Sequence, residues 1–105
     1  KKEKDPDIII TVDNGISSIE GTSLARSLGI DVIITDHHLP PTILPDANAI
    51  INPNLEGCKF PSKNLAGVGV CFYLFSALKT HLEGLNYFKK NKISVPDLRE
   101  LLDLV

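Results

Sequence analysis

Two short runs of β-branched residues, separated by the pattern of one helix, constrain the fold of this chain more than any other feature. The runs are Ile8–Val12 and Val32–Thr35, and continuous apolar runs of this length are typical of strands buried on both faces of a parallel sheet. Between them, Ser17 and Glu20 have the spacing of a capping box, and Gly29 stands where helix C-termini prefer glycine. Strand, helix and strand in this order form a βαβ unit, so we expect parallel strands joined by a right-handed crossover.

One more strand and two more helices extend this pattern along the chain. Ala49–Ile51 has the character of a third short strand. Asn64 is placed to cap a long helix over residues 65–82, and Pro96 with Asp97 opens a final helix. We therefore expect the α/β class, as a three-layer Rossmann-like βαβ fragment with a parallel sheet inside a larger domain.

Composition and charge exclude several classes of protein. The 105 residues are 43% apolar and 23% charged, as in an ordinary globular protein, and no apolar run approaches the roughly 20 residues that span a bilayer, so we expect no membrane partner. The net charge of −2 gives no basic footprint, although a local patch or metal ions can still hold phosphate. Cys58 and Cys71 are isolated, which favours reduced thiols in a cytoplasmic protein over a disulfide scaffold.

Polar side chains of the metal-binding kind follow each of the first two strands. Asp13 comes directly after the first strand, and Asp36, His37 and His38 come directly after the second. Ligands bind outside the carboxyl ends of the strands in open α/β sheets, and neighbouring strands lie about 5 Å apart. We therefore expect the Asp13 carboxylate and the His37 imidazole to reach a common ion. Oxygen and imidazole donors suit Mn²⁺, Mg²⁺, Fe²⁺ or Zn²⁺, and the absence of thiolates argues against structural zinc.

Two features of this site have a plainer interpretation as well. Asp13 stands before Asn-Gly, which is a common turn sequence after a strand. Gly67, Val68 and Gly69 begin the long helix, where free backbone N–H groups bind anions, but glycine there also permits close helix packing. Lys63 flanks the same loop and is a candidate source of positive charge.

The motifs of this chain, taken in order, resemble those of the DHH phosphoesterase superfamily. The matching strings are Val-Asp-Asn-Gly at 12–15, Thr-Asp-His-His-Leu-Pro at 35–40, the segments 45–53 and 58–61, and Leu-Ala-Gly-Val-Gly-Val at 65–70. Their order is similar to the RecJ-like single-strand-specific exonucleases in particular. The resemblance implies phosphodiester hydrolysis with two Mn²⁺ or Mg²⁺ ions, acting 5′→3′ on single-stranded DNA in repair and recombination. Single-stranded DNA and other repair or replication proteins are the partners that it implies.

The same resemblance assigns a role to each candidate residue. Asp13 matches the carboxylate that bridges the two metals, and His37 matches a ligand of one of them. Asp36 resembles a supporting catalytic residue that orients its neighbours. His38 matches a histidine that faces the scissile phosphate, as a hydrogen-bond donor or an acid. The helix start at Gly67, Val68 and Gly69 would help to hold the substrate phosphate.

Part of the family's pattern is expected outside these 105 residues. An earlier pair of aspartates belongs before residue 1, and a further aspartate ligand belongs after residue 105. We therefore expect residues 1–105 to form a partial DHH domain that alone binds Mn²⁺ weakly and hydrolyses nothing. Two other functions stay open: a DHH phosphodiesterase acting on oligoribonucleotides, cyclic dinucleotides or other small phosphates, and a non-enzymatic DHH scaffold.

Overall fold

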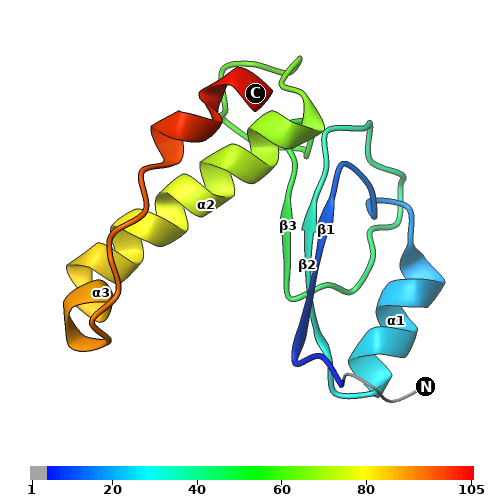
Figure 1. Cartoon of the computed structure of the whole chain (residues 1–105). Coiled ribbons are helices and arrows are strands. Elements are labelled where there is room, and N and C mark those ends of the chain that lie inside the picture. Colours follow the sequence, from blue (N-terminus) through cyan, green and yellow to red (C-terminus); the bar gives the residue numbers. More distant parts are fainter. Residues whose placement is uncertain (1–4) are drawn as a thin grey trace.

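Three parallel strands form the sheet of the computed structural model, which describes residues 5–105. Their order is β1 (Ile8–Val12), β2 (Asp31–Thr35) and β3 (Ala49–Ile51), with β2 in the centre (Figure 1). Val12 lies opposite Thr35, and Thr35 lies opposite Ile51, so all three strands end at the same edge. The predicted α/β class and parallel sheet are confirmed.

Helix α1 (Ile19–Ser27) connects β1 to β2 and packs against β2. Its Ala25 joins Val32 and Ile34 in the buried core. The predicted capping box is wrong, because the turn at Gly15 makes Ser18 the N-cap and no side chain there accepts a hydrogen bond. Gly29 does end the helix as expected, with a φ of +76° that favours glycine.

Burial differs sharply between the two predicted core strands. Ile34 of β2 is fully buried, whereas Ile8, Ile9 and Ile10 of β1 are 36–46% exposed. The prediction of burial on both faces therefore holds for β2 and is wrong for β1. Within residues 5–105, β1 lies at the edge of the sheet and helix α1 packs chiefly against β2, so the faces of β1 are less covered.

The second half of the chain is helical. Helix α2 (Gly67–Gly84) begins near the edge where the strands end and runs away from the sheet (Figure 1). Its N-cap is Ala66, so the prediction that Asn64 caps this helix is wrong by two residues. A short helix α3 (Tyr87–Lys90) and a 3₁₀ helix η1 (Leu98–Leu104) follow, and the Asp97 side chain caps η1 as expected. No helix within residues 5–105 is long and apolar enough to cross a membrane.

Candidate metal centre

The site lies where β1 and β2 end side by side. The Asp13 backbone N–H donates to the Thr35 carbonyl at 3.0 Å, which extends the pairing of the strands by one residue. Asp13 then turns into the left-handed region with a φ of +63°, and Gly15 follows at +106°. A Cβ atom at Gly15 would lie 2.7 Å from Thr11 Oγ1, so the turn needs glycine there.

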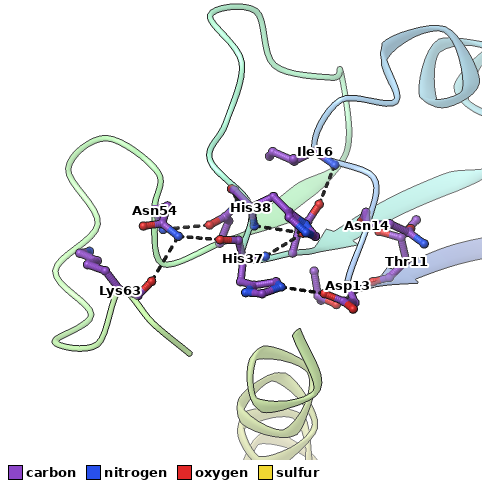
Figure 2. A network of polar contacts seen from close by, with 11 residues as sticks. Thr11, Asp13, Asn14, Ile16, His37, His38, Asn54 and Lys63 are labelled. Atoms are coloured by element: carbon purple, nitrogen blue, oxygen red, sulfur yellow. Dashed lines mark hydrogen bonds and ion pairs between the residues drawn. The ribbon is translucent and has the colours of Figure 1, made fainter. Parts of the chain in front are cut away.

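Three side chains with metal-binding atoms converge at this edge. Asp13 Oδ1 and His37 Nε2 are 2.8 Å apart. One ligand atom from each of Asp13, His37 and His38 lies within 4.8 Å of the others (Figure 2). The side chains of Asp13 and His38 are each 60% exposed, so solvent reaches these donor atoms. The arrangement matches the predicted proximity of Asp13 and His37 and adds His38 to it.

Asp36 lies beneath the histidines and is 1% exposed. Its Oδ2 accepts from the Ile16 N–H at 3.1 Å, and its Oδ1 accepts from the backbone N–H groups of His37 and His38 at 2.8 and 3.2 Å. His38 Nδ1 lies 2.6 Å from the same Oδ1. Burial raises the pKa of Asp36, but the hydrogen bonds from Ile16, His38 and His37 together outweigh it and hold the pKa below its ordinary value.

An ionised Asp36 has a direct consequence for His38. A carboxylate only accepts hydrogen bonds, so Nδ1 of His38 must carry the proton that it shares with Asp36. The other ring nitrogen, Nε2, is then free to meet a ligand. Asp36 itself is almost fully buried, and its hydrogen bonds hold the backbone of His37 and His38 and the His38 ring.

Two asparagines that the sequence analysis did not single out also hold the histidines. Asn52 Nδ2 donates to the His38 carbonyl at 2.8 Å, and Asn54 Nδ2 donates to the His37 carbonyl at 2.6 Å. The signal available in the sequence was their place directly after β3, at the edge where β2 also ends. Lys63 Nζ donates to the carbonyls of Pro53 and Cys58, so it ties down this loop and is not the free positive charge that we expected.

The start of α2 approaches the same edge. A Cβ atom at Gly67 would overlap the Asp13 carboxylate, so the first turn of the helix packs directly against this side chain. The Gly69 N–H donates to the Ala66 carbonyl at 2.9 Å, and a Cβ atom at Gly69 would overlap Leu65. The Gly69 N–H therefore already has an acceptor within the first turn of the helix. Gly67 and Val68 remain as helix-start donors.

Comparison with known proteins gives a consistent result. Residues 2–105 match the family model described as "DHH family, N-terminal domain". The chain is 60% identical over 104 residues to the single-stranded-DNA-specific exonuclease RecJ of Salmonella typhimurium, and 63% identical over 98 residues to that of Escherichia coli. These alignments cover 99% and 93% of this chain, but only 18% and 17% of the two relatives.

Solved structures show the same similarity. A crystal structure of exonuclease RecJ bound to manganese superposes with a TM-score of 0.61 at 29% identity, covering 86% of this chain and 20% of that one. RecJ from Thermus thermophilus in complex with Mn²⁺ gives a TM-score of 0.58 at 27% identity, covering 86% and 12%. Most of this chain thus has the fold of two proteins solved with manganese.

Proposed function

The chain belongs to the DHH family, and on that premise we propose that it supplies part of the metal-dependent active site of a single-stranded-DNA-specific exonuclease. The observation that carries this proposal is the convergence of donor atoms from Asp13, His37 and His38 within 4.8 Å at one edge of the sheet. The similarity to RecJ proteins supports the substrate, and the manganese in their solved structures supports the cofactor.

The donor set fits Mn²⁺ or Mg²⁺, which prefer carboxylate oxygen and accept imidazole nitrogen. Asp13 and His37 would hold the metal, with Asp13 shared between two ions and other ligands supplied from outside residues 1–105. Two such ions would supply Lewis acidity, which activates water and stabilises the negative charge on the oxygens of the reacting phosphate. The short Asp13 to His37 distance shows that both donors can face one point.

His38 is arranged to meet the substrate phosphate. Its Nδ1 is held by Asp36 at 2.6 Å, which fixes the ring, and its side chain is 60% exposed. A protonated Nε2 would donate to a phosphate oxygen or to the leaving oxygen, which is the role of hydrogen-bond donor or acid that we propose for His38. Asp36 therefore contributes by orienting the His38 ring.

The first turn of α2 contributes backbone donors. The N–H groups of Gly67 and Val68 lie in the first turn, where helices leave N–H groups without an internal acceptor. An anionic phosphate placed beside the metal centre would accept from these groups and benefit from the positive end of the helix dipole. Gly69 follows them in the same turn, and residues 67–69 together are the proposed phosphate-binding segment.

The proposal extends to the whole protein from which these residues come. It would remove mononucleotides 5′→3′ from single-stranded DNA during repair and recombination, in the cytoplasm and alongside other repair or replication proteins. The chain spans about 18% of the length of its Salmonella relative. We therefore assign the strand-binding surface and the remaining metal ligands to parts of the whole protein outside residues 1–105. Both described cysteines are free, in keeping with a reducing compartment.

The test uses the intact parent protein with Mn²⁺ on two substrates in parallel, a 5′-labelled single-stranded DNA of a few dozen nucleotides and a labelled dinucleotide. We expect early release of labelled mononucleotide from the long strand, strong inhibition by salt, and loss of this activity in His37→Ala. Preferential cleavage of the dinucleotide would replace the proposal with a small-substrate phosphodiesterase. Absence of hydrolysis of both substrates by the wild-type protein, with no further change in His37→Ala, would favour a non-enzymatic scaffold.

A further inference from the structure

The two histidines of the centre lie on a short irregular segment after β2, and the backbone of each is held from two sides. On one side, Asp36 Oδ1 accepts both N–H groups. On the other side, the His37 carbonyl accepts from Asn54 and the His38 carbonyl accepts from Asn52 (Figure 2 shows the Asn54 contact). The two asparagines reach the histidine carbonyls from 14 and 17 positions away in the sequence, whereas Asp36 holds the N–H groups from the adjoining position.

The asparagines are themselves locked in one orientation. The Asn54 backbone N–H donates to Asn52 Oδ1 at 2.8 Å, so the amide nitrogen of Asn52 must face the His38 carbonyl. Asn54 Nδ2 lies between two carbonyls, those of His37 at 2.6 Å and Lys63 at 3.4 Å, so this atom must be the NH₂ group. Neither amide can flip without facing acceptor against acceptor.

Lys63 completes the support from the far end of the loop. Its Nζ donates to the carbonyls of Pro53 at 2.6 Å and Cys58 at 2.9 Å, which closes residues 53–63 on themselves. Asn52 is 2% exposed, and its amide makes both of its contacts out of water. The loop after β3 is thus a rigid frame whose contact with the centre runs through two amide groups.

We propose that Asn54 and Asn52 are positioning residues with separate tasks, Asn54 setting the metal ligand His37 and Asn52 setting the substrate-facing His38. This inference rests on the function proposed above. It assigns the loop after β3 to the active site, although no side chain of that loop provides a metal ligand in the described cluster. The two asparagines should therefore affect different quantities, Asn54 the Mn²⁺ affinity and Asn52 the rate of turnover, which a purely structural loop would not show.

The variants that test the division remove the amide donors with little change in volume. Asn54→Leu in the full-length parent protein is expected to weaken Mn²⁺ binding by roughly tenfold to a hundredfold, the range seen when groups that orient metal ligands are removed. Saturating Mn²⁺ should restore most of its turnover. Asn52→Leu is expected to lower kcat by a similar factor while Mn²⁺ binding stays at the wild-type level. Mn²⁺ binding is measured without DNA, from the electron paramagnetic resonance signal of the free ion.

Asn48→Leu is the matched control. Asn48 also bridges two groups through its amide, accepting from the Val32 N–H at 2.7 Å and donating to Asp31 Oδ1 at 2.8 Å, but it lies at the opposite edge of the sheet. We expect it to lower thermal stability without changing Mn²⁺ binding or kcat. Asn54→Ser and Asn52→Ser, which are smaller and polar, repeat the test where a leucine variant does not fold.

The inference is overturned if Asn54→Leu and Asn52→Leu leave Mn²⁺ binding and kcat at the wild-type level, as expected for Asn48→Leu, or if both variants change Mn²⁺ binding and kcat by the same factors. Failure of the proposed function gives a different result, because the wild-type protein would then not cut single-stranded DNA. The effect of Asn54→Leu on Mn²⁺ binding is measured without DNA and does not depend on that outcome.

Discussion

The sheet half and the helical half of this chain are held together in different ways. Up to Lys63, buried or half-buried side chains bond to backbone groups 10 to 24 positions away, as Asp36 does with Ile16 and Asn54 with His37. From α2 onward, the side-chain hydrogen bonds that the structure describes join residues two or four positions apart. The chemistry therefore sits where distant parts of the chain are tied together.

The helical half has a different kind of surface. Apolar side chains of α2 and η1 line an open groove of ≈ 470 Å³, including Phe72, Phe75, Leu98 and Leu101. Leu101 is 47% exposed, and Phe75 is 40% exposed. Apolar contact without directional bonds allows side chains to repack, whereas the centre requires fixed atoms. In the described residues, long-range side-chain hydrogen bonds gather at the carboxyl edge of the sheet and hold the atoms of the centre in place.

The largest expected effect tests this contrast in the apolar interior. Ile34→Ala removes a fully buried side chain from the core between β2 and α1 and should cost about 2–5 kcal/mol of unfolding free energy. Leu101→Ala, in the half-exposed groove, should cost less than about 1 kcal/mol, because its side chain already contacts water. Urea-induced unfolding of both variants measures the difference. Equal costs would show that the groove is a second core.

The next effect concerns the contact between the two halves. Gly67→Ala places a Cβ atom into the Asp13 carboxylate, so we expect a loss of about 1–3 kcal/mol in stability and weaker Mn²⁺ binding. Gly84→Ala, at the other end of α2, meets no atom within 4 Å and should leave Mn²⁺ binding unchanged. Thermal unfolding and metal titration of the two variants provide the comparison. Wild-type Mn²⁺ binding in Gly67→Ala would mean that α2 does not constrain Asp13.

The smallest effect lies in the helical half, at the cap of η1. The side-chain hydrogen bonds from Arg99, followed by its backbone N–H, lower the pKa of Asp97 from 3.8 to about 2. Because the pKa is lower in the folded chain, any stabilisation from this carboxylate is present above its ordinary pKa and disappears as the pH falls through about 2. The pair is exposed, so its contribution to stability is small.

Arg99→Ala checks this last prediction. The midpoint of the Asp97 carboxyl titration, followed by NMR, should move up toward 3.8, because the largest cause of the shift is removed. The backbone N–H of residue 99 still donates, so part of the shift should remain. An identical midpoint in both proteins would show that the Arg99 side chain does not engage Asp97 in solution.

The sequence predicted those features that depend on local pattern and on the general geometry of parallel sheets. The β-branched runs located β1 and β2, and the rule that parallel strands end together brought Asp13 to His37. The helix starts were less accurate, since Ser18 and Ala66 take the cap positions according to how the preceding turns pack. A capping pattern alone does not contain that information.

The supports of the centre were missed for a related reason. Asn52 and Asn54 bond to carbonyls 14 and 17 positions away, and no local spacing marks such a contact. Lys63 was a candidate source of positive charge because its charge is visible in the sequence, whereas the carbonyls that accept from it come together only through the fold of the loop. The contacts that could not be predicted are therefore those between residues far apart in the sequence, which meet only when the loop folds.

The left-handed backbone of Asp13 has a consequence for engineering. A φ of +63° suits glycine or asparagine better than most residues. Asp13 therefore supplies a carboxylate at the cost of a less favourable backbone conformation. Selection for heat resistance alone places no demand on the carboxylate, and glycine adopts this φ without strain, so such a selection can lose the carboxylate. A thermostabilisation campaign on this domain should therefore hold position 13 constant and screen every round for retained manganese affinity.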